Sequence, residues 1–363
     1  MSETIFKKRR VAPIVVGAVI VLAAFGVASF FVDRVILNQM YARTPASSPN
    51  LLATYDDFAS ARKDGLEREP VEFELDGKTL RGYVYGPENT RGLIVFRHGI
   101  YSQHQNYLAL IVAMVDKGWR VFAYDAIGCG ESDGDSVIGL AQSPIDVAAA
   151  VRFARESGMA DGMKIALWGH SWGGYGVAAA LDSCASDVSA CVTMSGFDTP
   201  MKALESGARS SMGPFAFAHT PTLWLNTVLT FGPDANRSAS QAIINSGVRT
   251  LIMHGSNDST VPYDDVSILD NTLSDGNAPA NVSTMTFDEP GRSEHTTYFY
   301  SVESQKYLNE CAEKQQQLLE ENDDDPNAPE VSAFLTTVDR LKANTADPNL
   351  IKEIDSFLEN ALN

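Results

Sequence analysis

One six-residue segment constrains the fold of this chain more than any other part of its sequence. Gly169-His170-Ser171-Trp172-Gly173-Gly174 follows the apolar run 164–168 and precedes a stretch of helical character. A G-x-S-x-G motif between a strand and a helix is typical of a nucleophile elbow, a turn too tight for Cβ atoms at its glycine positions. The pentapeptide alone is common, but this placement makes the signal much stronger. It predicts a serine hydroxyl raised above the edge of a sheet.

The segments around this motif alternate between short apolar runs and longer helical stretches. The apolar runs are 93–96, 121–124, 164–168, 190–194 and 250–253. Strands that are covered on both faces read as continuous apolar runs, so this alternation predicts a mostly parallel central sheet with helices on both faces. Residues 71–75 and 80–85 alternate in polarity around Asp76-Gly77, which predicts an antiparallel hairpin at the start of the sheet. The expected fold class is α/β.

We expect a single catalytic domain over residues 70–363 with two insertions. The aromatic-rich insertion 197–247 is either a small lid over a pocket or a structural insertion with its own core. The helical and acidic insertion 301–346 contains the run 320–325, which lacks the oxygen spacing and central glycine of an EF-hand loop. We therefore expect that run to be solvated. A final helix is expected after Asp347, its N-cap.

The N-terminal 69 residues have a different character. Residues 1–10 form a basic tail, 11–32 are 22 residues without a charge, and 33–69 are a polar linker or stalk with a short helix at 51–63. As a helix, residues 11–32 span roughly 30 Å, the thickness of a bilayer core, and so predict a transmembrane anchor. The positive-inside rule places the N-terminus in the cytoplasm and the catalytic domain outside the cell membrane. A cleaved signal peptide is the alternative.

Charge and cysteine content limit the partners. The formal net charge of −18 repels phosphate backbones, so we expect no nucleic-acid partner. Cys184 and Cys191 are either a disulfide in an oxidising compartment or two separate buried thiols. The spacings of the four cysteines do not suit zinc, and we expect neither a metal nor an organic cofactor.

A serine nucleophile needs a histidine base that is oriented by a carboxylate, and in this type of fold the chain order is Ser, acid, His. Of the six histidines, His295 alone follows a candidate acid at the end of the seventh strand, and it comes after the strand 283–287. Asp258, just past the strand 250–253, is the favoured acid, and Asp198, past the preceding strand, is its rival. Two backbone N–H groups, those of Ile100 and Trp172, are expected to form the oxyanion hole.

The ordered motifs resemble those of the α/β-hydrolase superfamily, in particular its serine aminopeptidase and monoacylglycerol-lipase-like branch. The resemblance covers about residues 70–300 and the last helix, and the motifs that carry it are His98-Gly99, the loop 124–132, the elbow 169–174, the segment 254–258 and His295. It implies that Ser171 is the nucleophile, Asp258 the acid and His295 the base, and that 197–247 is a lid. Cys129, the insertion 301–346 and the anchor depart from the usual pattern and leave the substrate undefined.

We therefore expect a membrane-anchored, extracytoplasmic serine hydrolase that cleaves acyl esters through an acyl-enzyme on Ser171. Its substrate is a small-molecule ester, a lipid or a peptide. The first alternative is a serine peptidase of the aminopeptidase or prolyl oligopeptidase kind, which needs a carboxylate for the substrate's amino group; in the lid segment the candidates are mainly Glu205 and Asp234. The second is a non-catalytic binding protein on a hydrolase fold.

Overall fold

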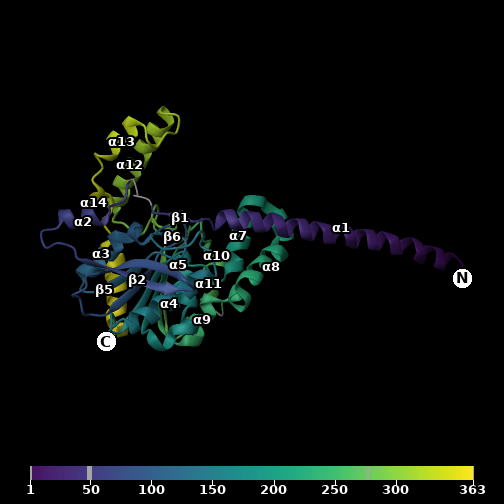
Figure 1. The fold of residues 1–363 in the computed structure, drawn as a ribbon, viewed down its shortest axis with the longest axis horizontal. Helices are drawn as coiled ribbons and strands as arrows, with labels where there is room; N and C mark the ends of the chain where they lie inside the picture. The colour runs from purple at the N-terminus through teal and green to yellow at the C-terminus, as the bar shows by residue number, and fades with distance from the viewer. Residues whose placement is uncertain (1, 47–50, 275, 277, 363) are drawn as a thin grey trace.

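An eight-stranded sheet forms the centre of the molecule in the computed structural model, which describes residues 2–46, 51–274, 276 and 278–362, with side chains from residue 15 onward (Figure 1). The strand order is β10-β9-β8-β7-β4-β5-β3-β2. The neighbouring strands from β10 to β5 pair in parallel, whereas β3 pairs antiparallel with both β5 and β2. Their bounds are β2 Arg68–Leu75, β3 Lys78–Tyr85, β4 Leu93–Arg97, β5 Arg120–Tyr124, β7 Ile165–His170, β8 Ala190–Met194, β9 Arg249–Gly255 and β10 Val282–Phe287. The predicted α/β class and mostly parallel sheet are confirmed.

The antiparallel start of the sheet is the predicted hairpin. Asp76 and Gly77 connect β2 to β3, with φ angles of 51° and 73°. Two-residue hairpin turns of the type that matches strand twist need positive φ at both central residues, which Asp and Gly tolerate. The local sequence therefore sets the register of this edge of the sheet.

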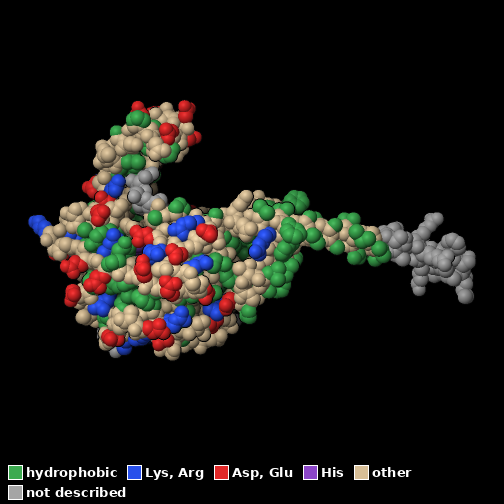
Figure 2. All heavy atoms as spheres, in the orientation of Figure 1, with side chains coloured by type: hydrophobic (Ala, Val, Ile, Leu, Met, Phe, Trp, Pro, Cys, Tyr) green, Lys and Arg blue, Asp and Glu red, His purple; other side chains and the backbone are tan. Residues whose placement is uncertain are grey.

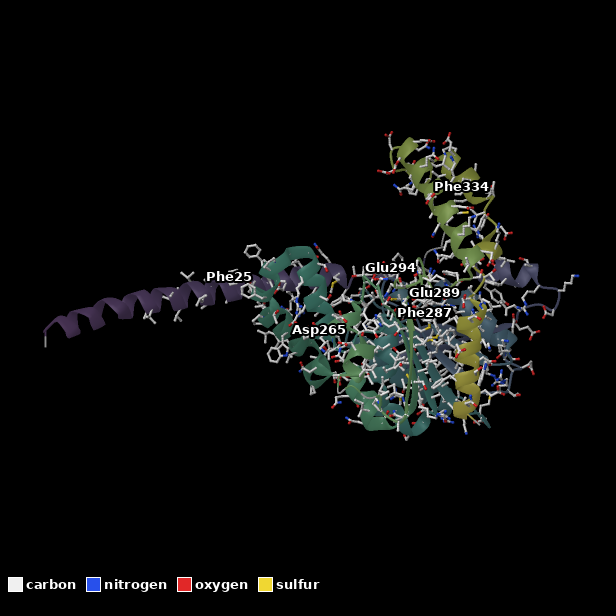
Figure 3. The ribbon with its side chains drawn as sticks, turned by 180° about the vertical axis from the view of Figure 1, so that it is seen from behind. Phe25, Asp265, Phe287, Glu289, Glu294 and Phe334 are labelled. Carbon is white, nitrogen blue, oxygen red and sulfur yellow. The ribbon has the colours of Figure 1, made fainter. Side chains whose placement is uncertain are left out.

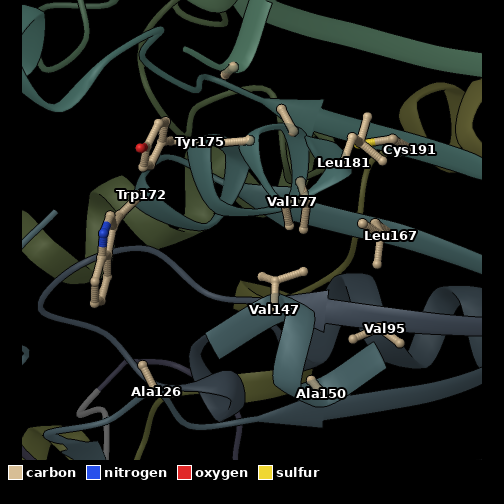
Figure 4. Packing of buried hydrophobic residues seen from close by; sticks show 14 of the residues in the cluster. Val95, Ala126, Val147, Ala150, Leu167, Trp172, Tyr175, Val177, Leu181 and Cys191 are labelled. Atoms are coloured by element: carbon tan, nitrogen blue, oxygen red, sulfur yellow. The ribbon is translucent and has the colours of Figure 1, made fainter. Parts of the chain in front are cut away.

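Helices cover both faces of the sheet. One face carries α4 (Gln142–Glu156), α5 (Trp172–Ala179), α9 (Ala239–Ser246) and α11 (Ile268–Thr272), and the other carries α3 (Leu108–Asp116) and α15 (Pro348–Leu362). Successive strand residues serve opposite cores: Leu93 and Val95 pack into the first cluster, which Figure 4 shows in part, and Ile94 and Phe96 into the second. This period of two explains why the strands read as continuous apolar runs.

The last helix begins as the sequence predicts. The Oδ1 atom of Asp347 accepts a hydrogen bond of 2.8 Å from the N–H of Leu350, the interaction of an N-cap residue. Shorter helices lie in the connections between strands: η1 His104–Tyr107, α6 Leu181–Cys184, η2 Ala185–Asp187 and the irregular α10 Tyr263–Val266.

Two helical segments are inserted into the sheet-forming order. The first lies between β8 and β9 and consists of α7 (Pro200–Met212), η3 (Gly213–Ala218), α8 (Thr220–Phe231), η4 (Gly232–Asn236) and α9. The second, α12 (Val302–Glu321), α13 (Pro329–Leu335) and α14 (Arg340–Ala343), projects from the domain; Phe334 marks its outer part in Figure 3. The acidic run 320–325 lies at the end of α12, where most of its side chains are exposed.

The N-terminal helix extends further than the sequence predicts. Helix α1 runs over Ser2–Met40, and its described part, Val15–Met40, is long and apolar enough to cross a membrane. The last turns of α1 do not form a free stalk, because Asp33 and Leu37 are buried, as is Tyr41 just after the helix. The helix thus continues past Asp33, the charged residue before which we expected the membrane span to end, because its last turns pack against the domain.

The chain after α1 is also fixed to the domain. Strand β1 (Thr44–Pro45) pairs in parallel with β6 (Cys129–Gly130), and the Arg43 guanidinium donates to the carbonyl oxygens of Gly130, Ser132 and Gly134. Part of the linker, residues 47–50, lies outside the described residues. Helix α2 (Tyr55–Ala61) falls within the predicted helical stretch and begins at the N-cap Thr54.

All four cysteines are buried free thiols. Of the two alternatives for Cys184 and Cys191, a disulfide or two separate buried thiols, the structure shows the separate thiols. Burial raises the pKa of the Cys184 thiol to about 12, which keeps this thiol protonated and unreactive at neutral pH.

Candidate active site

Ser171 stands at the turn between β7 and α5 with a strained backbone. Its φ angle is 58° and its ψ angle is −120°, and its N–H donates to the carbonyl of Met194 at 2.8 Å. A Cβ atom on Gly169 would lie 2.3 Å from the oxygen of Gly173, and one on Gly173 would lie 2.1 Å from the oxygen of Arg97. Only glycine fits at these positions, so the flanking glycines permit the turn that carries the serine.

His295 and Asp258 form a hydrogen-bonded pair beyond the carboxyl ends of β10 and β9. The Nδ1 atom of His295 lies 2.7 Å from Oδ2 of Asp258, while Oδ1 of Asp258 accepts from the N–H groups of Thr260 and Val261. Burial by itself raises the pKa of Asp258, but the hydrogen bond and charge of His295 and these N–H donors hold the pKa below its usual value. Asp258 is therefore ionised and orients the imidazole.

The His295 ring lies beside the elbow. Its centroid is 4.5 Å from that of His170, the residue before Ser171. The hydrogen bonds of the described residues do not include one from the Ser171 hydroxyl to His295. Such catalytic hydrogen bonds are often long without substrate and tighten in the complex.

Asp198, the rival acid, has other partners. Its Oδ1 atom accepts from the Ser238 hydroxyl at 2.8 Å and from the Ser240 N–H at 2.9 Å, at the start of α9. Its Oδ2 atom lies 3.7 Å from the Lys202 ammonium. These contacts assign Asp198 to the connection between β8 and the helical insertion that follows it, and no hydrogen bond of the described residues joins Asp198 to His295.

The loop after β4 adjoins the serine. A Cβ atom placed on Gly99 would lie 3.4 Å from Cβ of Ser171, so the segment with Ile100 borders the nucleophile. Trp172 is the first residue of α5, and its N–H cannot join the helical ladder. The predicted oxyanion donors, the N–H groups of Ile100 and Trp172, thus come from two segments that meet at Ser171.

A hydrogen-bonded chain that our reading of the sequence missed joins this loop to the histidine loop. The Gly99 N–H donates to the Tyr107 hydroxyl at 3.1 Å, and that hydroxyl lies 2.8 Å from Nδ1 of His170. Nε2 of His170 lies 3.1 Å from the carbonyl oxygen of His295. Burial holds the pKa of His170 well below its usual value, so the ring is neutral, accepts at Nδ1 and donates at Nε2. No sequence motif signals Tyr107; only the variable position within G-x-S-x-G marks His170.

The described residues contain no group of three or more His, Cys, Asp or Glu side chains placed to hold a metal ion. The site offers a serine, an imidazole-carboxylate pair and backbone donors. That set suits acyl transfer.

The sequence and the fold were compared with known proteins. The sequence model of the family described as "Serine aminopeptidase, S33" matches residues 88–216, a range that contains Ile100, Ser171 and Trp172. An esterase from Pyrococcus furiosus superposes with a TM-score of 0.54 at 16% sequence identity, over 87% of this chain and 100% of that chain. This chain has the fold of the α/β hydrolases, and residues 88–216 match the model of one of their families.

Two curated relatives are similar to this chain in sequence. The uncharacterised protein YfhR of Salmonella typhi is 24% identical over 261 residues, which cover 69% of this chain and 80% of that protein. The thiohydrolase apmlB of Arthrinium phaeospermum is 33% identical over 107 residues, or 28% of this chain and 35% of that protein. The structural likeness establishes the fold, and the reaction has to be argued from the site.

Proposed function

We propose that this α/β hydrolase cleaves carboxylic esters through an acyl-enzyme on Ser171. The observation that carries the proposal is the strained turn at Ser171 next to the pair of His295 and Asp258. In this pair, Nδ1 of His295 lies 2.7 Å from Oδ2 of the buried, ionised Asp258. His295 Nε2 takes the proton of the serine hydroxyl as Oγ attacks the ester carbonyl. The N–H groups of Ile100 and Trp172 stabilise the oxyanion, and His295 then protonates the leaving alcohol.

The second half of the reaction repeats these roles with water. His295 removes a proton from a water molecule that attacks the acyl-enzyme carbonyl, and the same N–H groups stabilise the second oxyanion. Collapse of this intermediate breaks the bond to Ser171 Oγ, which regains its proton from His295, and releases the carboxylic acid. Asp258 stays ionised throughout and stabilises the imidazolium.

An ester is favoured over a peptide by the pairing of two lid-segment carboxylates. Glu205 lies 3.5 Å from the Arg209 guanidinium, and Asp234 lies 2.5 Å from that of Arg237. An aminopeptidase needs a carboxylate free to bind the α-amino group of its substrate, and both candidates already have a cation partner. The peptidase remains the second candidate because the matching family model is described as a serine aminopeptidase.

We further propose that α1 anchors the enzyme in the cell membrane, with the N-terminus cytoplasmic and the catalytic domain outside. In support, the described part of α1 is apolar and largely exposed, and the basic residues 7–10 precede the apolar run. A cleaved signal peptide would leave no such helix on the mature protein. Sequencing the N-terminus of the protein purified from membranes separates the two possibilities.

An activity-based label tests the nucleophile. A fluorophosphonate should label the full-length protein in detergent, and Ser171→Ala should abolish the labelling. Ser210→Ala, which removes an exposed hydroxyl on α7, is the matched control and should label as the wild type does. If well-folded wild-type protein takes up no label, the reaction proposed here is wrong and the non-catalytic binding protein is favoured.

A substrate panel tests the bond that is cleaved. p-Nitrophenyl esters of increasing acyl length and aminoacyl p-nitroanilides release the same type of chromophore, so their kcat/KM values compare directly. We expect turnover of the esters that depends on Ser171. Faster turnover of the anilides than of every ester would replace the esterase with the peptidase.

A further inference from the structure

The lid helix α8 is fastened to the base of α1 by a buried carboxylate. The side chain of Asp33 on α1 is only 3% exposed; its Oδ1 atom lies 2.7 Å from Nδ1 of His219, and its Oδ2 atom accepts from the Thr222 hydroxyl at 2.5 Å. One turn earlier on α1, the carbonyl oxygen of Phe30 accepts from the Asn226 amide at 3.2 Å. The lid therefore cannot be placed independently of the helix proposed as the anchor.

The position of this carboxylate relates the lid to the bilayer. Asp33 is the first charged residue after the apolar run 11–32, where a membrane-spanning helix leaves the hydrocarbon. A carboxylate at that depth is costly unless it is paired within the protein. His219 and Thr222 supply the pairing, so α8 has to lie at the level where α1 emerges from the membrane.

The same part of the lid exposes large apolar side chains. We define the lid patch as the five exposed large hydrophobic residues of η3 and α8: Phe215, Phe217, Trp224, Leu225 and Leu229. Phe215 and Phe217 are 74% and 76% exposed. Residues 213–231 contain no Asp, Glu, Lys or Arg, although a fifth of the whole chain is charged. A patch of this kind on an otherwise charged surface marks an interaction site.

The lid patch continues the apolar surface of α1. Figure 2 shows hydrophobic side chains gathered around the point where α1 leaves the catalytic domain, and Figure 3 marks Phe25 on the part of α1 that extends beyond the lid. Phe25 and Phe31 of α1 are themselves half or more exposed. Whatever surrounds α1 therefore meets the lid patch as well. Aromatic side chains are enriched where a protein crosses the membrane-water interface.

We propose that the lid patch is immersed in the interface of the bilayer that α1 spans, and that Asp33 holds it there. This inference rests on the proposed anchoring of α1. It makes the bilayer the partner of the segment 197–247, which the sequence predicts to be a lid. The substrate class that this arrangement favours is an amphiphilic acyl ester already partitioned into the lipid, which approaches Ser171 along the lid rather than from bulk water.

The tryptophans of the chain provide a direct test. Trp119, Trp168 and Trp172 are at most 1% exposed, whereas Trp224 in the lid patch is 44% exposed. The full-length protein is reconstituted in nanodiscs of phosphatidylcholine with or without bromine atoms on the upper part of the acyl chains, which quench tryptophan within contact distance. We expect brominated lipid to quench the Trp224 part of the emission. This quenching should be lost in Trp224→Phe.

Two variants and a control test the arrangement. Phe215→Ser with Phe217→Ser should reduce the quenching by weakening the insertion of the patch, and Asp33→Ala should reduce it by freeing α8 from α1. Val302→Ser removes an apolar side chain of 60% exposure on α12 and should leave the quenching unchanged. Equal loss in all three would show a general change of the protein and would overturn the specific role of the patch.

The remaining outcomes separate this inference from the proposed anchor. Protein that does not enter nanodiscs, and that alkaline carbonate extracts from membranes, overturns the anchor and with it the immersed lid. Protein that enters nanodiscs but whose Trp224 emission is the same in both lipids overturns the immersed lid alone. Disulfide cross-linking of Phe217→Cys between two molecules in one nanodisc, without such quenching, would assign the patch to a second copy of the chain.

Discussion

Asp258 and Asp198 lie beyond neighbouring strands of the sheet but accept hydrogen bonds from different groups. His295 donates to Asp258, whereas the Ser238 hydroxyl and the Ser240 N–H donate to Asp198. Asp258→Asn should lower kcat for a p-nitrophenyl ester by about 10⁴-fold, because an amide favours the wrong imidazole tautomer and cannot stabilise the imidazolium. Asp198→Asn should change kcat less than about 10-fold, since it alters only a helix start.

Circular dichroism of both variants is the control, because each aspartate is buried. A folded Asp198→Asn protein with the larger loss of kcat would transfer the role of the acid to Asp198. Equal losses in two folded variants would contradict the assignment of either residue by geometry.

The Tyr107 hydroxyl connects the loop of Ile100, a proposed oxyanion donor, to the elbow. Tyr107→Phe leaves the buried Gly99 N–H and His170 Nδ1 without their partner, and an unsatisfied buried polar group costs about 1–3 kcal/mol. We expect a lower free energy of unfolding in urea together with a lower kcat, because the loop that presents Ile100 is no longer fixed.

Tyr124→Phe provides the matched control for this prediction. Both tyrosines are buried, but the Tyr124 hydroxyl has no hydrogen-bond partner among the described residues. Its removal should leave kcat unchanged and should not lower stability. If Tyr107→Phe behaves like Tyr124→Phe, the hydrogen-bonded chain does not position the site.

At the scale of elements, the strand-elbow-helix unit depends on glycine. In Gly173→Ala the new methyl group would lie 2.1 Å from the Arg97 oxygen and 2.6 Å from the His98 oxygen, both backbone atoms that cannot move independently. We expect separation of α5 from β4, and loss of soluble folded protein or of more than about 3 kcal/mol of stability. Expression yield and the thermal midpoint measure this effect.

Gly207→Ala tests whether the effect is local. Gly207 lies within α7, and a Cβ atom at this position would have no neighbour within 4 Å among the described residues. The same substitution there should raise stability by as much as about 1 kcal/mol, since alanine favours a helix over glycine. If Gly207→Ala lowers stability while Gly173→Ala is as stable as the wild type, the close contacts at Gly173 are not what makes glycine necessary there.

Sequence reasoning succeeded where the information is local. The apolar runs identified the strands, Asp76-Gly77 identified the hairpin turn, and Asp347 identified the start of the last helix, because each signal lies within a few residues of its element. It failed at the end of α1, where Asp33 would stop a free transmembrane helix. Partners nearly 190 residues away, His219 and Thr222, bury its charge, and nothing near Asp33 in the sequence announces them.

The candidate site shows the same division between local and long-range information. The elbow and the chain order of acid and base are sequence motifs, and they name Ser171, Asp258 and His295 as candidates; the structure places His295 Nδ1 2.7 Å from Asp258 Oδ2. The link from Tyr107 to His170 depends on how η1 packs against β7, a contact between residues 63 apart. Only the folded arrangement of the two segments reveals it.

At the scale of the whole molecule, buried histidines set the response to acid. Burial lowers the pKa of His98 to about 3 and lowers those of His170 and His254 as well. In the unfolded chain these side chains bind protons below about pH 6.5. The unfolded state therefore gains protons that the native state excludes, and each histidine lowers the free energy of unfolding by up to about 1.4 kcal/mol per pH unit below that value.

His98 isolates this effect from the loss of negative charge on acidification, which relieves self-repulsion in a chain of net charge −18. Its Nδ1 donates to the Gly99 oxygen at 2.7 Å and its Nε2 accepts from the Ala126 N–H at 3.0 Å, so a second proton has no place on the native ring. His98→Gln should be less stable than the wild type at pH 7.5, and thermal midpoints at pH 7.5, 6.0 and 5.0 should show this gap narrowing, because only the wild type loses the contribution of His98. A gap that is constant or widens across this range would mean that His98 takes up a proton without unfolding.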